Sequence, residues 1–406
     1  MASSLKSRLA RLRERRETPG PARASAAPRP APAFLSTWDQ VDEFLFARRL
    51  LFPFHLPMEF DALPFVAPLD GERKGRGREP LPVRADGLRF FDFETTGLSG
   101  GAGTVSFLSA LGRIEDGNLS VEQHFLSDYP GEPAFVKSFI EGLGEAPVLV
   151  SYNGRSFDWP LFRSRCVMCG VREPVAALHV DLLKTTRRLW RRILGSVALG
   201  DIEGPLLGKN RADDIPGSEI PSAFFAFLED GDDDRLGLVA SHNAEDVASL
   251  AGLLAKCIGL FGDPLDGAGA GEIDLRNLGR LLRSCGRIAE GEELLWRAAR
   301  GGDIAAALAL ARRFRREGRA AEAGRAIALA GDGYEACLES SRIAERLQGD
   351  VVAALSAAQA AAGKARDETR RNRAFVRARR LSLRIAGASR ERPGHTRSGS
   401  PGAGNP

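Results

Sequence analysis

The chain has 406 residues, of which 43% are hydrophobic and 27% charged, and its formal net charge is +4. No stretch approaches the roughly 20 apolar residues that a membrane-spanning helix needs. The five cysteines form no disulfide framework, and the basic N-terminus lacks the apolar core of a secretory signal. We therefore expect a cytoplasmic protein without a membrane anchor, made of two folded units and tails.

Positive charge is concentrated at the two ends of the chain. Residues 1–30 contain eight Lys/Arg and two Glu, and residues 364–397 contain twelve Lys/Arg and three acidic residues, so the part between them is acidic. Basic ends around an acidic body suit a protein that holds cations in its site and attracts a polyanion. Arginine-rich ends that only keep the protein in solution are the alternative.

The N-terminal third contains two stretches that are too polar or too rich in proline to pack. Residues 1–33 are rich in Pro and Ala, which predicts a disordered basic tail. A first helix is expected to begin near Thr37. The charged Gly/Pro stretch at residues 70–80 is typical of an exposed connector.

Five segments have the length and apolar pattern of β-strands. The first three are LRFFDFETTGL, TVSFLSALGRI and LSVEQHFL, separated by Gly-rich or Asp-Gly turns, and they predict a three-stranded meander. Residues 146–152 and 177–183 each lie between helical patterns. The sequence therefore predicts an α/β domain with a mixed five-stranded sheet and flanking helices.

From about residue 272 the sequence changes to Ala, Leu and Arg at helical spacing. Turns recur at Gly286, Gly318 and Gly349, with spacings of 32 and 31 residues. A period in the low thirties is typical of paired helices in a tetratricopeptide-like solenoid, although an Ala-rich bundle gives the same pattern. The predicted domains are a tail at 1–33, an extension and linker at 34–86, the α/β domain at 87–262, an all-α helical-repeat domain at 272–385 and a disordered tail at 386–406.

Two carboxylates stand two residues apart on the first predicted strand, at Asp92 and Glu94. Alternation along a strand points both to one face, while Phe91 and Phe93 point to the other. Oxygen ligands of this kind suit Mg²⁺ or Mn²⁺, and two such ions can clamp the attacking and leaving oxygens of a phosphodiester. A solvated pair of acids at the rim of a sheet is the alternative interpretation.

Two further acidic segments follow. Asp158 comes after the strand at 146–152 and opens a helix, where it can also serve as an N-cap. His242 and Asp246 are four residues apart on a later helix that runs to about Cys257, so they share one face. The imidazole can then reach a water near the carboxylate, whereas a structural histidine is the alternative.

Together these segments resemble the three exonuclease motifs of the DEDD superfamily of proofreading-type nucleases, which have the ribonuclease H fold. The closer resemblance is to the YprB-like ribonuclease H-like family, in which this domain is fused to a tetratricopeptide region. The resemblance covers roughly residues 88–260. The residues that carry it are Asp92–Leu98, Ser99–Thr104, Asn153–Pro160, His179–Leu183, Asp213–Pro221 and His242 to Asp246.

The resemblance implies a metal-dependent nuclease that hydrolyses phosphodiester bonds, a 3′–5′ exonuclease or a ribonuclease. Two Mg²⁺ or Mn²⁺ ions would be held by Asp92, Glu94, Asp158 and Asp246, with His242 as a fifth catalytic residue. His242 departs from the usual pattern, because a catalytic histidine commonly stands five residues before the last aspartate. Four is the spacing of the tyrosine branch, so two roles stay open: general base, or positioning of a water.

We expect nucleic acid, as a single-stranded end or RNA, to be the substrate, and the helical repeats to offer a surface for a protein partner. Expected contacts with the nucleic acid come from Thr95, Thr96, Asn153, Lys184, Arg187, Arg188 and Arg191. The last four belong to a basic helical stripe that also includes Arg192, for which a merely solvated face is the alternative.

Three other features are given lesser roles. The loop Ser99–Gly103 lacks the Gly-Lys-Ser/Thr of a phosphate-binding loop, so a nucleoside triphosphate site is rejected. Asp181 is expected to support the site, and Cys166 and Cys169 to pack in the core. The competing hypothesis for the whole chain is a catalytically weak nucleic-acid-binding adaptor whose helical repeats recruit protein partners.

Overall fold

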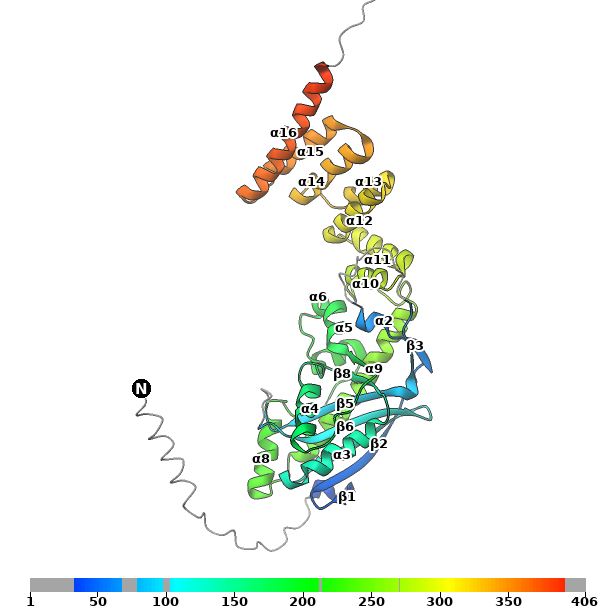
Figure 1. The fold of residues 1–406 in the computed structure, drawn as a ribbon, viewed down its shortest axis with the longest axis vertical. Coiled ribbons are helices and arrows are strands. Elements are labelled where there is room, and N and C mark those ends of the chain that lie inside the picture. Colours follow the sequence, from blue (N-terminus) through cyan, green and yellow to red (C-terminus); the bar gives the residue numbers. More distant parts are fainter. Residues whose placement is uncertain (1–32, 68–78, 98–102, 212–213, 270, 391–406) are drawn as a thin grey trace, which may run out of the picture.

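The structure is a computed structural model that describes residues 33–67, 79–97, 103–211, 214–269 and 271–390. Figure 1 shows a sheet domain at one end and a row of helices that extends from it along the long axis. The predicted tails fall largely outside the described residues, as do most of the connector at 70–80, the glycine-rich loop after Gly97, and Asp213. The last helix continues beyond the predicted boundary at residue 385, to Arg390.

A mixed seven-stranded sheet forms the centre of the first domain, with the strand order β1-β2-β7-β6-β5-β8-β9. The pairs β5–β8 and β8–β9 are parallel and the others antiparallel, so the predicted meander of β5, β6 and β7 is confirmed. The strands are β1 (Asp39–Asp42), β2 (Leu45–Pro53), β5 (Leu88–Thr95), β6 (Ser106–Glu115), β7 (Asn118–Leu126), β8 (Val148–Ser151) and β9 (Leu178–Asp181), and β3 (Glu59–Asp61) pairs separately with β4 (Pro82–Arg84).

The prediction of a helix from Thr37 was wrong. Thr37 ends a short 3₁₀-helix, Ala33–Thr37, and the following residues form the hairpin of β1 and β2. Strand β2 pairs with β7 along its whole length, from Leu45 opposite Leu126 to Pro53 opposite Asn118. The physical reason is the edge of the sheet, because β7 would otherwise expose unpaired backbone groups. The sheet therefore has seven strands where five were predicted.

Helices cover both faces of the sheet and create two cores. One core contains Phe91 and Phe93 with residues of α3, α4 and α8, and the other contains Phe90 with residues of α5 and most of α9. The helices of this domain are α2 (Leu63–Val66), α3 (Glu132–Leu143), α4 (Asp158–Met168), α5 (Leu182–Leu189), α6 (Arg191–Leu194), α7 (Leu199–Ile202), α8 (Ile220–Asp230) and α9 (Leu236–Gly262), with short η2 (Ala85–Gly87), η3 (Tyr129–Gly131) and η4 (Glu203–Leu207).

Helix α9 lies unusually close to the sheet because β6 carries a glycine at the crossing. A Cβ atom at Gly112 would lie 2.7 Å from Cγ1 of Val247 and 3.2 Å from Cβ of Phe90. A real Cβ atom essentially never has a contact as short as 2.7 Å, so the absence of a side chain permits this approach. It brings the first half of α9 down onto β5, where Asp92 and Glu94 lie.

The helix-rich region predicted from residue 272 is confirmed. Neighbouring helices pack in succession from α10 onward, and Figure 1 shows α16 at the outer end. The assignment to tetratricopeptide-like repeats stays a prediction. The helices are α10 (Leu275–Ser284), α11 (Ile288–Arg300), α12 (Ile304–Glu317), α13 (Ala320–Ala328), α14 (Tyr334–Ile343) with η5 (Ala344–Gln348), α15 (Val351–Gly363) and α16 (Glu368–Arg390).

The core of the sheet domain continues into the helical region. One cluster of buried side chains runs from β5 and α9 through α10 to α13 without interruption. The backbone N–H of Asp274 donates to the Leu189 carbonyl at 2.8 Å, and Arg192 pairs with Asp274 and Asp303. The predicted boundary between residues 262 and 272 is therefore crossed by shared packing. Among the described residues, no helix is long and apolar enough to span a membrane.

Candidate functional site

The first two predicted site residues lie on β5 and point to the face that α9 covers. Phe91 and Phe93 enter the opposite core, where Phe93 stacks on Phe162 with ring centroids 5.4 Å apart. These rings anchor the strand, so Asp92 and Glu94 are presented to α9 by a rigid element.

Asp92 is held by a chain of buried polar groups. Nδ2 of Asn243 donates to Oδ2 of Asp92 at 2.9 Å, and Nε2 of Gln123 donates to Oδ1 of Asn243 at 2.9 Å. Arg48 on β2 in turn donates from Nε to Oε1 of Gln123 at 2.8 Å. Asn243 and Gln123 are fully buried, so these bonds fix the orientation of both amides and of the Asp92 carboxylate.

Asp158 is the first residue of α4 and is buried. The turn before it depends on Asn153, which has a left-handed φ of 66°, and on Asp181 at the end of β9. Oδ1 of Asp181 accepts from the backbone N–H of Asn153 at 2.9 Å and from that of Leu183 at 3.2 Å. Asp181 thus ties the Asn153 turn to the start of α5, which is the supporting role expected for it.

His242 lies among three carboxylates near the middle of the site. Its Nδ1 is 2.6 Å from Oδ1 of Asp214, and its Nε2 is 3.6 Å from Oδ2 of Asp246 and 4.0 Å from Oε1 of Glu94. Nη1 of Arg211 also lies 3.2 Å from Nδ1, but the contact with the carboxylate is the shorter one, and we assign the proton to Nδ1 on that ground. In the neutral imidazole, Nε2 is then the acceptor, and it faces the side of the site where the acids converge.

Arg211 forms the largest ion-pair network of the site. Its Nη2 is 2.5 Å from Oε1 of Glu203 and 2.5 Å from Oδ1 of Asp246, and its Nε donates to Oε2 of Glu203 at 2.8 Å. Glu203 is buried, so the guanidinium is anchored through two bonds to it. Arg211 therefore binds Oδ1 of Asp246, and the other oxygen, Oδ2, faces His242.

Burial gives these carboxyl groups unusual protonation behaviour. Burial first, and the charges of Asp246 and Asp158 second, raise the pKa of Asp92 well above its ordinary value. The pKa of Glu94 is also raised well above its ordinary value, by burial first and then by neighbouring carboxylates, of which Asp92 acts most strongly. Burial raises the pKa of Asp158 to about 7, with Asp181 adding to it.

Asp246 differs from the other three because it forms an ion pair with Arg211. Burial raises its pKa, but His242 and Arg211 oppose that effect. The four groups thus share a buried region with more negative charge than the protein itself compensates, and a divalent cation would compensate it. The donor set, all carboxylates, also matches the oxygen ligands that Mg²⁺ and Mn²⁺ prefer.

The side chains are not gathered around a single point. Within the described ranges, no group of three or more His, Cys, Asp or Glu side chains is close enough to hold an ion as it stands. The reason lies in their partners, since Asp92 bonds to Asn243 and Asp246 to Arg211. The residues fit an oxygen-binding metal by chemistry and by charge, and binding requires rotation of these carboxylates.

The residues expected to contact nucleic acid fall into two groups. Hydroxyls of Thr95 and Thr96 are used locally, because Oγ1 of Thr95 donates to the Gly97 carbonyl at 2.9 Å and Oγ1 of Thr96 accepts from Val105 N–H at 3.0 Å. Both bonds shape the chain that leaves β5 beside the acids. Asn153 is exposed at the turn before α4.

The basic stripe on α5 and α6 is divided between surface and structure. Lys184, Arg187 and Arg191 are exposed. Arg188 instead donates from Nη1 to the Ala67 carbonyl at 2.9 Å, and Arg192 pairs with acids of the helical region. Three of the five cations are thus available to a phosphate backbone.

Several residues of the site were not assigned from the sequence. Asn243 lies within the His242–Asp246 segment, and the 100° per residue of a helix could have identified it as the side chain facing β5. Arg211, Glu203 and Gln123 have no local signal, since their partners are distant in sequence. Cys166 and Cys169 are free thiols, and Cys166 is fully buried, in keeping with core packing.

Most of the sheet domain is similar to a known protein family. Residues 89–258 match the family model described as the RNase_H superfamily. The chain is also 40% identical over 168 residues to a protein of Bacillus subtilis (strain 168) that bears the name Uncharacterized protein YprB. The aligned segment covers 41% of this chain and 40% of that relative. Residues 89–258 are thus similar to the ribonuclease H superfamily, and a helix-rich region follows them.

Proposed function

We propose that the chain is a metal-dependent nuclease that hydrolyses phosphodiester bonds at the site formed by Asp92, Glu94, Asp158 and Asp246. The observation that carries the proposal is that β5, α4 and α9 place four buried or partly buried carboxylates in one region, where burial raises the pKa of each and neighbouring carboxylates raise those of Asp92 and Glu94 further. Such an excess of negative charge is costly to folding and is typical of a functional site.

Two Mg²⁺ or Mn²⁺ ions bound by these carboxylates would polarise the phosphoryl group and lower the pKa of a bound water. The protein's own residues supply orientation. Asn243 holds Asp92 in one rotamer, and Arg211 holds one oxygen of Asp246. These bonds leave Oδ1 of Asp92 and Oδ2 of Asp246 as the oxygens that can turn toward an ion, which limits the reorganisation that metal binding requires.

His242 has the orientation of a general base. Asp214 accepts from Nδ1, so Nε2 of the neutral ring can take a proton from a water that lies between it and the acids. Its spacing from Asp246 is that of the tyrosine branch, which by itself favours positioning of the water. The hydrogen bond to Asp214 moves our preference to the base role, because positioning alone does not require a fixed tautomer.

The substrate proposed for this site is a single-stranded end of nucleic acid, RNA or DNA. Lys184, Arg187 and Arg191 are exposed on α5 and α6, which follow directly after Asp181 of the site. Arginine and lysine at such positions bind phosphates without reading sequence. A 3′–5′ exonuclease is our preferred activity, with ribonuclease action as its close alternative.

A second candidate is a catalytically weak nucleic-acid-binding adaptor. The observation that favours it is the ion pair between Arg211 and Asp246, which satisfies one proposed ligand with a cation of the protein itself. In an adaptor of this kind the ion pair would persist in the presence of Mg²⁺. The surface offered to protein partners would then lie on α10 to α16.

One experiment separates the candidates. The full chain is incubated with 20-nucleotide single strands of RNA and DNA, labelled at either end, with Mn²⁺ or with EDTA. A 3′–5′ exonuclease gives a ladder from 5′-labelled strands only with Mn²⁺, whereas an adaptor retards the strands without shortening them. Asp158→Asn is the inactive variant, and Asp230→Asn is its matched control because Asp230 is exposed at the end of α8. Cleavage by Asp158→Asn equal to that by the control would refute the nuclease proposal.

A further inference from the structure

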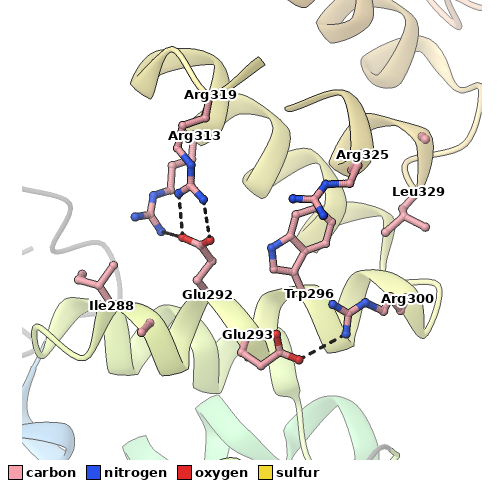
Figure 2. A pocket seen from close by; sticks show the side chains of 11 residues that line it. Ile288, Glu292, Glu293, Trp296, Arg300, Arg313, Arg319, Arg325 and Leu329 are labelled. Carbon is pink, nitrogen blue, oxygen red and sulfur yellow. Dashed lines mark hydrogen bonds and ion pairs between the residues drawn. The ribbon is translucent and has the colours of Figure 1, made fainter. Parts of the chain in front are cut away.

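The helical region contains a pocket that the proposed active site does not use. It has a volume of about 890 Å³ and lies between α11, α12 and α13. Pockets of this size are large enough for a nucleotide. Figure 2 shows its side chains, which come from all three helices and include a tryptophan, four arginines and two glutamates.

Trp296 provides a flat aromatic surface in this pocket. On one side the indole stacks against Phe314, with ring centroids 5.8 Å apart and an angle of 23° between the planes. The guanidinium carbons of Arg325 and Arg300 lie 5.7 and 5.9 Å from its ring centroid. Figure 2 shows Arg325 beside the indole. The ring is therefore held in place by Phe314 and flanked by two cations.

Among the described residues, three of the four arginines in the pocket are paired with glutamates, and Arg325 is not. Glu292 pairs with Arg313 at 3.3 Å and with Arg319 at 3.4 Å, and Glu293 pairs with Arg300 at 3.3 Å. Arg325 is exposed and forms no salt bridge within the part of the chain that the structure describes. Arg313 and Arg319 also pair with Glu317 and Glu322, so their charges are compensated, and an anionic ligand gains most beside Arg325.

We propose that this pocket binds a nucleotide of a single-stranded nucleic acid, with the base against Trp296 and a phosphate against Arg325 and Arg300. A base stacks on an indole or a guanidinium whatever its identity, and phosphates are separated from bases by a sugar. The arrangement of Trp296 beside Arg325, which is unpaired among the described residues, with exposed Arg300 nearby, matches that repeat. An acidic peptide offers the charge but lacks a planar group for the indole.

The position of the pocket suits a nucleic-acid strand that extends from the proposed active site to the helical region. Helix α11 follows α10, which packs on α5, the helix that carries Lys184 and Arg187. Figure 1 shows α5, α10 and α11 in succession along the long axis. The inference rests on the proposed nucleic-acid substrate, and it assigns the part of the strand distant from the cut to the helical region.

The test measures binding separately from cleavage. Fluorescein-labelled 20-nucleotide RNA and DNA are titrated with full-length Asp158→Asn protein in EDTA, and the Kd is read from anisotropy. In this background Arg325→Glu is expected to raise the Kd about tenfold and Trp296→Leu about fivefold or more, whereas Trp296→Phe should stay within about twofold. Arg346→Glu is the matched control, because Arg346 is exposed on η5 and the charge change is identical.

Each other outcome overturns the proposal. An unchanged Kd for Arg325→Glu overturns it. An increase in Kd equal to that of Arg346→Glu also overturns it, because such an increase would reflect net charge alone. A 20-residue polyglutamate whose binding depends on Arg325, while the oligonucleotides bind normally, would assign the pocket to a protein partner. If Trp296→Leu fails to fold, as its melting curve would reveal, Arg325→Glu decides.

The proposed function fails separately. If wild-type protein binds these strands through Arg325 but cuts nothing with Mn²⁺, the pocket proposal stands and the nuclease proposal is refuted. If wild-type protein cuts the strands, and substitution of Arg325 or Trp296 does not change its binding, the nuclease proposal stands and the pocket proposal is refuted.

Discussion

Buried acids occur in both regions of the molecule, and their surroundings are opposite. In the helical region Glu339 is fully buried and bonds to Arg315 at 2.5 Å and to Arg342 at 2.8 Å. Glu345 bonds to Arg377 at 2.7 Å and to Arg380 at 2.6 Å. Burial alone would raise the pKa of each group, but the arginines outweigh it and lower both values.

In the sheet domain the same residue types are left without enough cations. Asp92, Glu94 and Asp158 have raised pKa values because burial acts together with neighbouring negative charge. The buried glutamates of the helical region are paired with arginines, whereas Asp92, Glu94 and Asp158, which we propose as metal ligands, have no arginine among the described ion pairs. The contrast separates structural carboxylates from functional ones by environment rather than by residue type.

The largest expected effect is on cleavage by Asp92→Asn or Asp158→Asn. Each removes a charged ligand, so we expect a loss of about a thousandfold, or about 4 kcal/mol of barrier. The melting temperature should hold or rise, because a repelled buried charge is removed. Cleavage rates with Mn²⁺ and melting curves in EDTA check both parts. Near-wild-type cleavage would remove the residue from the site.

The converse variant is Glu339→Gln in the helical region. It leaves two arginines facing a neutral group in a buried position, so the free energy of unfolding should fall by about 3 kcal/mol. Cleavage per folded molecule should be unchanged. Glu173→Gln is the control, because this half-exposed partner of Arg163 lies in the other region and should contribute below about 1 kcal/mol. Urea denaturation of both variants measures the difference, and equal midpoints would contradict the comparison.

Arg211 tests the intermediate case, a cation inside the acidic site. As a positioning residue it fixes Asp246, so Arg211→Ala should weaken activity and metal affinity about 10- to 100-fold. Arg211→Lys should recover only part, because an ammonium cannot bond both Glu203 and Asp246 in the same geometry. The Mn²⁺ concentration for half-maximal cleavage is the readout, with exposed Arg235→Ala as the control. If removal of Arg211 increased activity, it would instead be an inhibitor of metal binding.

Much of the sheet domain followed from local patterns. Alternation placed Asp92 and Glu94 on one face, and the strand, turn and helix order placed Asp158 at the start of α4. Helical spacing joined His242 to Asp246. These inferences succeeded because each depends on neighbours within a few residues, where backbone geometry decides direction.

What the sequence did not reveal depends on distant partners. Strand β2 was missed because its pairing with β7 joins residues more than 60 positions apart. Arg211 reaches Asp246 across 35 positions, and Gln123 reaches Asn243 across 120. The shared core at the 262–272 boundary is a similar case, because the spacing of the leucines in α10 predicts a buried face but does not indicate that α5 or α9 packs against it. Long-range complementarity is a property of the fold, and one sequence carries no local trace of it.

The smallest expected effect is a difference in pH dependence of stability without metal. Burial raises the pKa of folded Asp158 from its ordinary 3.8 to about 7, so between these values the folded state holds more protons than the unfolded state. Stability from this group is therefore lost as pH rises through that window, and Asp92 and Glu94 act in the same direction. Glu339 and Glu345 act oppositely, since their lowered pKa values make stability fall only as pH drops below the usual range of a glutamate.

In EDTA the melting temperature should decline by a few degrees from pH 5 to pH 8, and Asp158→Asn should flatten the decline while Asp230→Asn should not. Parallel slopes for the two variants would mean that Asp158 is not held in an uncompensated acidic site, and the contrast between the two regions would then rest on Asp92 and Glu94 alone.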